Sequence, residues 1–296
     1  MKDPSLIPCL ILFITPLLSP PTYLISSSSQ PKHIMASAQG KVVIITGAAG
    51  GLGRAIANAF LSAGALVSIC DVSQQRLAAV EDEWTKSYAG KFLTRETDVT
   101  SDKAVQELVE DTVAKFGRLD VLINNAGIMD DFSPAGAISK DLWNRVLDVN
   151  LNGPFLTTRA AIAQFEKQER PGGLIINIGS NASVYGFHAG VAYTVSKAGL
   201  LALTKNTAGF YGPKGIFCVA LLLGGMGDTN ITDAFANGLN TEAFQRIQSS
   251  QTAFEAGKTT VPIESVAKYC VFLADKDIAP NANGSGIFFN KNWPEA

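Results

Sequence analysis

The chain has 296 residues, 47% of them hydrophobic and 17% charged, with a formal net charge of −2 and no basic block. This length and composition predict one large α/β domain with a substantial core and argue against nucleic acid as a partner. The four cysteines lie far apart and the two histidines cannot complete a metal-ligand spacing, so we expect no metal site. Cysteines of this kind are typical of reduced thiols in an intracellular protein.

The first 34 residues differ in composition from the rest. The apolar run Leu6–Leu18 is interrupted by two prolines and is too short to span a membrane. It loosely resembles a secretory signal, so the secretory pathway is the alternative to a cytoplasmic location. The serine run Ser26–Ser29 is typical of a disordered linker. We expect residues 1–34 to be a dispensable extension and residues 35–296 to form a single cytoplasmic domain.

The stretch KVVIITGAAGGLGRAIANAF runs from Lys41 to Phe60. Val42–Ile45 is apolar and mostly β-branched, which predicts a buried strand, and apolar residues recur at helical spacing from Leu52 onward. The turn between strand and helix contains Gly47, Gly51 and Gly53. A glycine turn in this setting directs backbone N–H groups and the positive end of a helix at a phosphate, and lets the backbone approach a pyrophosphate closely.

A second apolar strand, Leu66–Cys70, is closed by Asp71. In a dinucleotide-binding fold an acid at this position hydrogen-bonds the adenosine ribose and repels a 2′-phosphate, which favours NAD over NADP. Alternatively, Asp71 starts a turn or caps a helix from Ser73 to about Tyr88. The glycine turn upstream favours the cofactor role. Arg54, directly after that turn, is a candidate phosphate contact.

Lys91–Glu96 is the third predicted strand, and Asp98 follows it. Asp98 contacts the adenine or caps a helix, and the sequence leaves the two open. Ser101 is the expected N-cap of a helix from Asp102 to Phe116. The fourth predicted strand, 118–123, ends in the turn Asn124–Gly127, at the edge where open α/β sheets bind ligands.

A long helical stretch from Leu142 to about Gln168 carries Asn150, and the next strand, 174–178, ends in Gly179 and Ser180. A helix over 192–210 then carries Tyr193 and Lys197, whose side chains share one face. A neighbouring ammonium favours the phenolate and lowers the pKa of a tyrosine, which makes this pair a proton-transfer unit.

Four motifs occur in order along the chain: Thr46–Gly53, Asn124–Gly127, Asn150, and Ser180 with Tyr193 and Lys197. Together they resemble the short, single-domain branch of the short-chain dehydrogenase/reductase family, over roughly Lys41 to Trp293. The resemblance implies an α/β fold, a Rossmann-like doubly wound parallel seven-stranded sheet with helices on both faces, and a homodimer or homotetramer. It also implies an NAD(P)-dependent oxidoreductase that interconverts a secondary alcohol and its ketone.

The resemblance assigns roles to individual residues. Tyr193 is the general acid in reduction and the base in oxidation, and Ser180 hydrogen-bonds the substrate oxygen. Lys197 lowers the pKa of Tyr193 and holds the nicotinamide ribose, and Asn150 anchors a water that links Lys197 to solvent. The expected cofactor-binding positions are Gly47, Gly51, Leu52, Gly53, Asp71, Asp98, Val99, Asn125, Ala126, Gly127, Tyr193, Lys197 and Thr229.

The chain departs from the family pattern at two places. After the strand 216–222 the family usually has Pro-Gly and then a threonine that contacts the nicotinamide. Here Leu223 replaces the proline and the spacing to Thr229 is one residue longer, which predicts a looser nicotinamide pocket. Near the carboxyl end, Asn290–Trp293 stands where the family often has Asp-Gly-Gly, which predicts altered packing there.

Residues 229–260 are polar with a few apolar anchors, among them Phe235 and Phe254. The resemblance implies a mobile lid over the substrate, and the alternative is an ordinary surface helical hairpin. The apolar side chains expected around the substrate predict a hydrophobic or aromatic alcohol or ketone: Met129, Phe132, Val184, Tyr185 and Phe187.

Two other interpretations remain. The altered loop 223–229 favours a dinucleotide-binding sensor with little turnover, and the intact catalytic set argues against it. The second interpretation, a secreted or membrane-surface protein, is supported by the first eighteen residues alone. Asn181-Ala182-Ser183 is a glycosylation acceptor beside Ser180, where a glycan would block the site, and it argues against secretion.

Overall fold

The computed structural model describes residues 38–293 except 228, 230, 232–237, 252–254 and 256. The chain divides into two units, Met1–Ile34 and Met35–Ala296, and every described element belongs to the second unit. The expected extension at residues 1–34 lies outside the described residues and stays a prediction.

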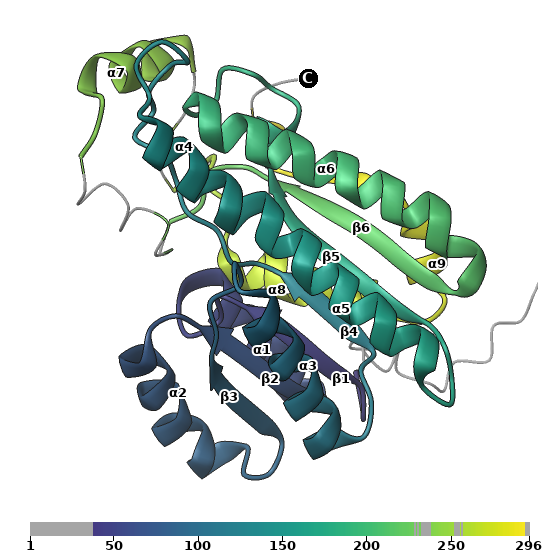
Figure 1. Ribbon diagram of the computed structural model, residues 1–296. Coiled ribbons are helices and arrows are strands. Elements are labelled where there is room, and N and C mark those ends of the chain that lie inside the picture. Colours follow the sequence, from purple (N-terminus) through teal and green to yellow (C-terminus); the bar gives the residue numbers. More distant parts are fainter. Residues whose placement is uncertain are drawn as a thin grey trace, which may run out of the picture. The chain divides into compact units, whose positions relative to one another are not determined.

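Seven parallel strands form one sheet in the order β3-β2-β1-β4-β5-β6-β7 (Figure 1). The strands are β1 (Val42–Thr46), β2 (Leu66–Asp71), β3 (Phe92–Glu96), β4 (Val121–Asn124), β5 (Gly173–Ser180), β6 (Ile216–Leu223) and β7 (Gly286–Phe289). The chain starts in the middle of the sheet, so the strand order reverses between β1 and β4, and such a point is where open sheets bind ligands. The Rossmann-like fold predicted from the sequence is confirmed.

Helices cover both faces of the sheet. They are α1 (Gly51–Ser62), α2 (Gln74–Ser87), α3 (Asp102–Phe116), α4 (Lys140–Leu147), α5 (Gly153–Lys167), α6 (Val191–Tyr211), α7 (Thr241–Ser250), α8 (Ile263–Leu273) and α9 (Ala279–Ala282). Successive strand residues point to opposite faces, so Ile45 packs in a core with α1 and α8 while Ile44 packs in a core with α3 and α5. None of the described helices combines the length and the apolar character that crossing a bilayer requires.

The helix expected over 142–168 is interrupted. It forms α4 and α5 joined by one π-helical turn, Asp148–Asn152, which contains Asn150. Apolar periodicity marked the helical extent, but a single inserted residue leaves that pattern nearly unchanged, so the sequence did not reveal the turn. π-turns of this kind frequently lie at functional sites.

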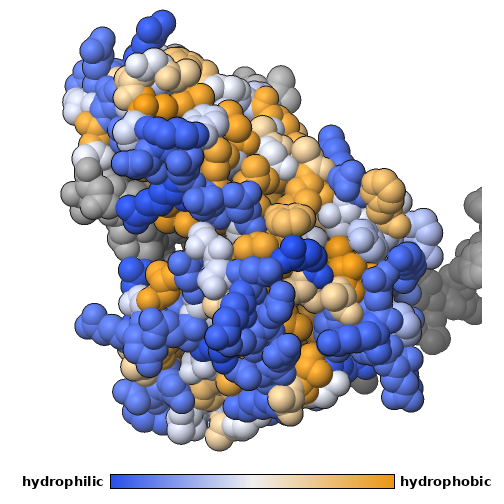
Figure 2. All heavy atoms as spheres, in the orientation of Figure 1, coloured by the Kyte–Doolittle hydropathy of each residue, from blue (hydrophilic) through white to orange (hydrophobic). Residues whose placement is uncertain are grey.

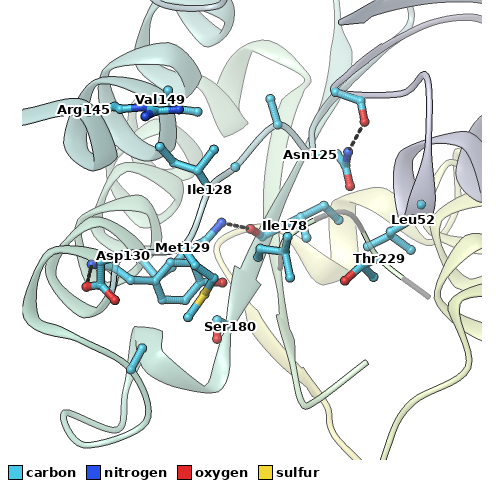
Figure 3. A pocket seen from close by; sticks show the side chains of 18 of the residues that line it. Leu52, Asn125, Ile128, Met129, Asp130, Arg145, Val149, Ile178, Ser180 and Thr229 are labelled. Carbon is cyan, nitrogen blue, oxygen red and sulfur yellow. Dashed lines mark hydrogen bonds between the residues drawn. The ribbon is translucent and has the colours of Figure 1, made fainter. Parts of the chain in front are cut away.

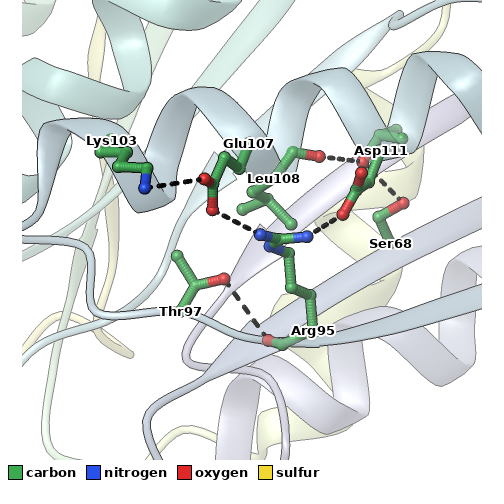
Figure 4. Close-up of polar contacts among 8 residues, drawn as sticks. Ser68, Arg95, Thr97, Lys103, Glu107, Leu108 and Asp111 are labelled. Atoms are coloured by element: carbon green, nitrogen blue, oxygen red, sulfur yellow. Dashed lines mark hydrogen bonds and ion pairs between the residues drawn. The ribbon is translucent and has the colours of Figure 1, made fainter.

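Polar contacts hold α3 on the part of the sheet formed by β2 and β3 (Figure 4). Arg95 of β3 pairs with Glu107, at 2.7 Å, and with Asp111, both on α3. Thr112 Oγ1 donates to Ser68 Oγ of β2 at 2.9 Å, and this bond is buried. These contacts hold the middle and the carboxyl-terminal half of α3 against β2 and β3.

The glycine turn is held against the turn that follows β4. Asn125 Nδ2 donates to Thr46 O and to Gly47 O, each at 2.9 Å. Thr46 Oγ1 accepts in return from Asn125 N at 3.1 Å and Ala126 N at 3.0 Å. Gly47 has φ +62°, and a Cβ there would lie 2.8 Å from Ala126 Cα, so the two turns approach to a distance that only glycine allows.

Gly53 offers a test of this close packing. A Cβ at Gly53 would lie 2.4 Å from Gly47 O and 2.5 Å from Asn125 Nδ2. We expect Gly53→Ala to lower the free energy of unfolding by about 1–3 kcal/mol, because the added methyl forces the two turns apart. Urea unfolding measures the change.

The control is Gly136→Ala, since a Cβ at that position meets nothing within 4 Å. We expect its free energy of unfolding to stay within about 0.5 kcal/mol of the wild-type value. Equal unfolding midpoints for the two variants would contradict the packing argument.

Candidate active site

A cavity of about 1330 Å³ opens at the carboxyl ends of the central strands (Figure 3). This exceeds the roughly 300–1,000 Å³ of common ligand pockets, so it has room for a dinucleotide together with a second small molecule. The residues predicted to bind cofactor or to act in catalysis line it, except Asn150, which is buried, and Arg54, the candidate phosphate contact. In Figure 3, Leu52, Asn125 and Thr229 lie at one end of the cavity, and Ile128, Met129 and Asp130 at the other.

Asp71 stands at the end of β2, where the cavity begins. Its Oδ2 accepts from Ala49 N at 3.3 Å, and its Oδ1 accepts from Ser73 N at 3.0 Å. Ser73 is the N-cap of α2 and accepts from Arg76 N, so Asp71 starts the turn without capping the helix itself. The carboxylate thus joins the glycine turn to the start of α2 at the edge of the cavity.

The next strand contributes a second acid. Asp98 Oδ1 accepts from the backbone N and the Oγ1 of Thr100, at 2.9 and 2.8 Å, while Ser101 caps α3 as expected. Asp98 lines the cavity as well as starting this turn. Arg54, the candidate phosphate contact, instead pairs with Glu83 of α2 and is not among the residues that line the cavity.

The structure brings Ser180 and Tyr193 together. Ser180 ends β5, Tyr193 lies in the first turn of α6, and the Ser180 side chain is close enough to the phenol to lower its pKa. Ser180 Oγ also accepts from Ala182 N at 3.1 Å, which fixes its orientation. Tyr193 is 7% exposed and both residues line the same cavity, so the two hydroxyl groups face one compartment.

Lys197 lies beneath this pair. Its Nζ donates to Ile178 O at 2.9 Å and stands 5.5 Å from the centroid of the Tyr193 ring. Burial lowers the pKa of Lys197 to about 8, since a buried ammonium is poorly solvated.

The pKa of Tyr193 differs from expectation. Burial raises it to about 12, the Ser180 side chain lowers it, and the charge of Asp130 raises it. The expected lowering by Lys197 is therefore wrong for this structure. Desolvation of the phenolate dominates, and the lysine nitrogen bonds the Ile178 carbonyl.

Asn150 braces the turn that leads to the cavity. Its Oδ1 accepts from Ile128 N at 2.8 Å, and its Nδ2 donates to Ile128 O at 2.9 Å and to Ser196 Oγ at 3.1 Å. Both amide hydrogens are used, and Oδ1 keeps a second lone pair. A Cβ at Gly127 would lie 3.4 Å from Asn150 Oδ1 and 3.5 Å from Lys197 Nζ, so both atoms flank this glycine.

The loop that follows β6 is held on two sides. Leu223 extends β6 by pairing with Phe289, Gly224 N donates to Phe289 O at 3.2 Å, and Gly225 O accepts from Val261 N at 2.8 Å. Thr229 lines the cavity. The looser pocket expected from the missing proline is not evident at the start of this loop, because backbone hydrogen bonds replace the stiffness of proline.

Sequence reasoning missed the carboxyl-terminal wall of the cavity. Lys291 and Asn292 both have positive φ, 53° and 55°, which turns the chain so that Trp293 lines the cavity. The Trp293 ring packs edge-on against His188, with centroids 5.9 Å apart. Asn181 Nδ2 donates to Trp293 O at 2.9 Å. Asn181 is 3% exposed, so a glycan has no room there in the folded chain.

The described part of the expected lid segment contains α7. Asn240 caps this helix, and its N donates to Asp131 O at 2.9 Å. Phe244 packs edge-on against Phe132 with ring centroids 4.8 Å apart. Phe235 and Phe254 lie outside the described residues, and the lid stays a prediction.

Asp130 is the other buried residue that sequence reasoning missed. It is 1% exposed and accepts a hydrogen bond from the backbone N of Tyr193 at 2.9 Å. The two residues are 63 positions apart, so no local capping pattern could have found the contact.

The buried lysine predicts a pH-dependent stability. The pKa of Lys197 falls from 10.5 to about 8 on folding, so between these values the unfolded chain binds more protons. The wild type therefore gains stability as pH rises through this range. We expect the free energy of unfolding of Lys197→Met, relative to that of wild type, to be highest at pH 7 and to fall towards pH 10.

Urea unfolding of both proteins at pH 7 and pH 10 measures this difference. Lys205→Met, at an exposed position on the same helix, is the control. A stability difference for Lys197→Met that is the same at both pH values would contradict the cost assigned to the buried ammonium.

Comparison with known proteins agrees with this geometry. The family model for short chain dehydrogenases matches residues 41–239. Short chain dehydrogenase/reductase dpchG of Colletotrichum higginsianum is 41% identical over 254 residues, 86% of this chain and 94% of its own. The 3beta-hydroxysteroid dehydrogenase 2 of Eggerthella lenta is 33% identical, over 86% and 95% of the two chains. The crystal structure of levodione reductase superposes with a TM-score of 0.75 at 26% identity, over 86% of this chain and 97% of that one. The chain belongs to the short-chain dehydrogenase/reductase family of oxidoreductases.

Proposed function

We propose that this oxidoreductase interconverts a secondary alcohol and its ketone with NAD(H), using Tyr193 as the general acid and base. The observation that carries the proposal is the meeting of Ser180, Tyr193 and Lys197 in one cavity whose other end is the glycine turn. Four residues from three separate segments, counting Asn150, support this chemistry together where each alone would be weak.

The nucleotide end of the cavity suits a dinucleotide. Gly47 and Gly53 have no room for a Cβ, and the first turn of α1 lines the cavity with Gly51 and Leu52. A helix start with unpaired N–H groups favours a pyrophosphate, and family membership implies a nicotinamide cofactor. When bound, this cofactor supplies the hydride in reduction and accepts it in oxidation.

The protein moves the proton. Tyr193 is protonated at neutral pH, as a phenol with the ordinary pKa of about 10 already is, and burial raises its pKa further, to about 12. Its hydroxyl can therefore donate to the carbonyl oxygen in reduction. The Ser180 hydroxyl beside it donates a hydrogen bond to the same oxygen as negative charge develops. In oxidation Tyr193 must first lose its proton, so that direction gains from rising pH.

Lys197 and Asn150 support this proton transfer without contacting the substrate. Lys197 has three N–H donors, of which one goes to Ile178 O, so the ammonium has donors for the nicotinamide ribose. The remaining lone pair of Asn150 Oδ1 suits a water that links Lys197 to solvent, as the family resemblance implies.

The substrate end of the cavity favours an apolar, ring-containing substrate. Its lining includes Met129, Met226 and Ile231, with the His188 and Trp293 rings beside them. Relatives named a 3beta-hydroxysteroid dehydrogenase and a levodione reductase agree with a cyclic alcohol or ketone here.

The homodimer or homotetramer implied by the resemblance stays a prediction. Phe155 on α5 and Val195 on α6 are 47% and 40% exposed. Figure 2 shows hydrophobic side chains scattered among charged ones over the face on which α5 and α6 lie.

Turnover tests the assignment. Purified protein is assayed with cyclic and aromatic secondary alcohols and ketones, with NADH, NADPH and their oxidised forms. We expect Tyr193→Phe to lose at least about 100-fold in kcat, because the acid is removed, and to bind NADH as tightly as wild type by fluorescence titration.

Tyr211→Phe is the matched control, since Tyr211 ends the same helix and is not among the residues that line the cavity. Full activity of Tyr193→Phe would refute the assigned acid. Cofactor binding without turnover across the panel would favour the alternative, a dinucleotide-binding sensor.

Cofactor choice depends on Asp71. We expect wild type to prefer NAD over NADP, because the carboxylate repels a 2′-phosphate, and Asp71→Ser to erode that preference by about tenfold or more. The ratio of kcat/KM for the two cofactors measures it. Asp98→Ser removes the same charge from the next strand end and should weaken both cofactors alike. An unchanged ratio in Asp71→Ser would remove the assigned role.

A further inference from the structure

The catalytic helix α6 begins without a cap of its own. Its N-cap is Gly190, which has no side chain to accept from the first backbone N–H groups. Asp130 supplies the acceptors from the loop after β4. Its Oδ1 accepts from Gly190 N at 3.2 Å and its Oδ2 from Tyr193 N at 2.9 Å. A carboxylate 60 residues upstream thus performs the capping that is normally local.

The fit between Asp130 and Gly190 is close. A Cβ at Gly190 would lie 2.4 Å from both carboxylate oxygens, so the helix start meets the acid only because this residue is glycine. Val191 N donates to Ser133 O at 3.0 Å, which fastens the same turn to the same loop. A buried carboxylate is costly, and the positive end of a helix is where that cost is best offset.

Asp130 also orders its own loop. Its Oδ1 accepts from Phe132 N at 3.1 Å, and Phe132 has φ +67°, which is rare for a bulky side chain. Two residues before Asp130, Ile128 is bonded through both its backbone groups to Asn150. The segment 128–132 therefore connects the turn after β4, the π-turn and the start of α6.

We propose that Asp130 is a positioning residue for the reaction: by capping α6 at Tyr193 it fixes the tyrosine hydroxyl beside Ser180 and above the nicotinamide end of the cavity. This rests on the proposed function of Tyr193 as acid and base. Positioning of this kind matters because a displacement of about 1 Å at a reacting group can cost about 100-fold in rate.

The charge of Asp130 has a second effect. The charged groups recorded against Tyr193 are Lys197 on α6, 5.5 Å from the centroid of its ring, and Asp130. His188 and Asp131 line the same cavity. The Asp130 charge raises the pKa of Tyr193. Removing it should move the acid limb of alcohol oxidation to lower pH, which a purely structural role would not do.

The test compares two substitutions of the same chemistry. In Asp130→Asn an NH₂ group replaces one carboxylate oxygen, so it faces a backbone N–H that it cannot accept from. The control is Asp120→Asn, because Asp120 also accepts a backbone hydrogen bond from a residue distant in sequence, Val42 N at 2.9 Å. Asp120 lies just before β4, at the amino-terminal ends of the strands, whereas the cavity lies at their carboxyl ends.

Three readouts are compared in the full-length chain. We expect Asp130→Asn to lose about 10- to 100-fold in kcat, with a smaller change in the cofactor KM, and to shift the pH profile of oxidation downward. In the free protein, amide hydrogen exchange should rise about tenfold or more over residues 190–193. Asp120→Asn should change none of these, although we expect its unfolding midpoint to fall as that of Asp130→Asn does.

A double-mutant cycle adds a check that does not depend on Asp130→Asn alone. Gly190→Ala should reproduce its loss of kcat, and the two changes together should cost no more than either one, because both break the same contact.

The outcomes separate the two proposals. Unchanged exchange at residues 190–193 in Asp130→Asn, or additive losses in the cycle, would overturn the role of Asp130. Faster exchange with wild-type kcat and pH profile would overturn it too, since the cap would then be structural only. Full activity of Tyr193→Phe would instead refute the proposed acid, while the exchange result would still stand.

Discussion

The hydrogen bonds between Asn125 and the backbone of Thr46 and Gly47 hold the one point on which the rest of the site depends. At this point the strand order reverses, and helices that leave β1 and β4 diverge to opposite faces. The shape of the crevice between these helices depends on the close contact between the glycine turn and the turn after β4. Gly47 permits this contact because it has no Cβ. The cavity, the start of α1 and the segment leading to Asp130 all follow from this junction.

Most of the fold could be predicted because its signals are local. Short apolar runs, β-branched in β1 and β5, marked most of the strands, and Ser73 and Ser101 cap α2 and α3 as their side chains suggested. The proposed catalytic set was visible because Tyr193 and Lys197 share one helix and one spacing. These features need only neighbouring residues to be recognised.

The remainder was hidden because it depends on contacts between distant residues. Asp130 caps a helix 60 residues away, and Trp293 meets His188 across more than a hundred. The pKa of Tyr193 was misjudged for the same reason: a sequence shows that Lys197 is near, but not that burial of the phenol outweighs it. The sequence showed that Lys291 and Asn292 stand where the family resemblance implies glycines, but not that both residues adopt positive φ.

The turn at Lys291 and Asn292 separates the part of the chain that shapes the cavity wall from the part that carries the hydroxyl groups of Ser180 and Tyr193. It delivers Trp293 to the cavity from beyond the last strand, whereas the hydroxyl groups of Ser180 and Tyr193 come from β5 and α6. Replacements in this late segment reshape what the cavity accepts while the proton donor keeps its surroundings. After gene duplication, paralogues can therefore diverge in the substrates that they accept while they retain the same proposed proton-transfer chemistry.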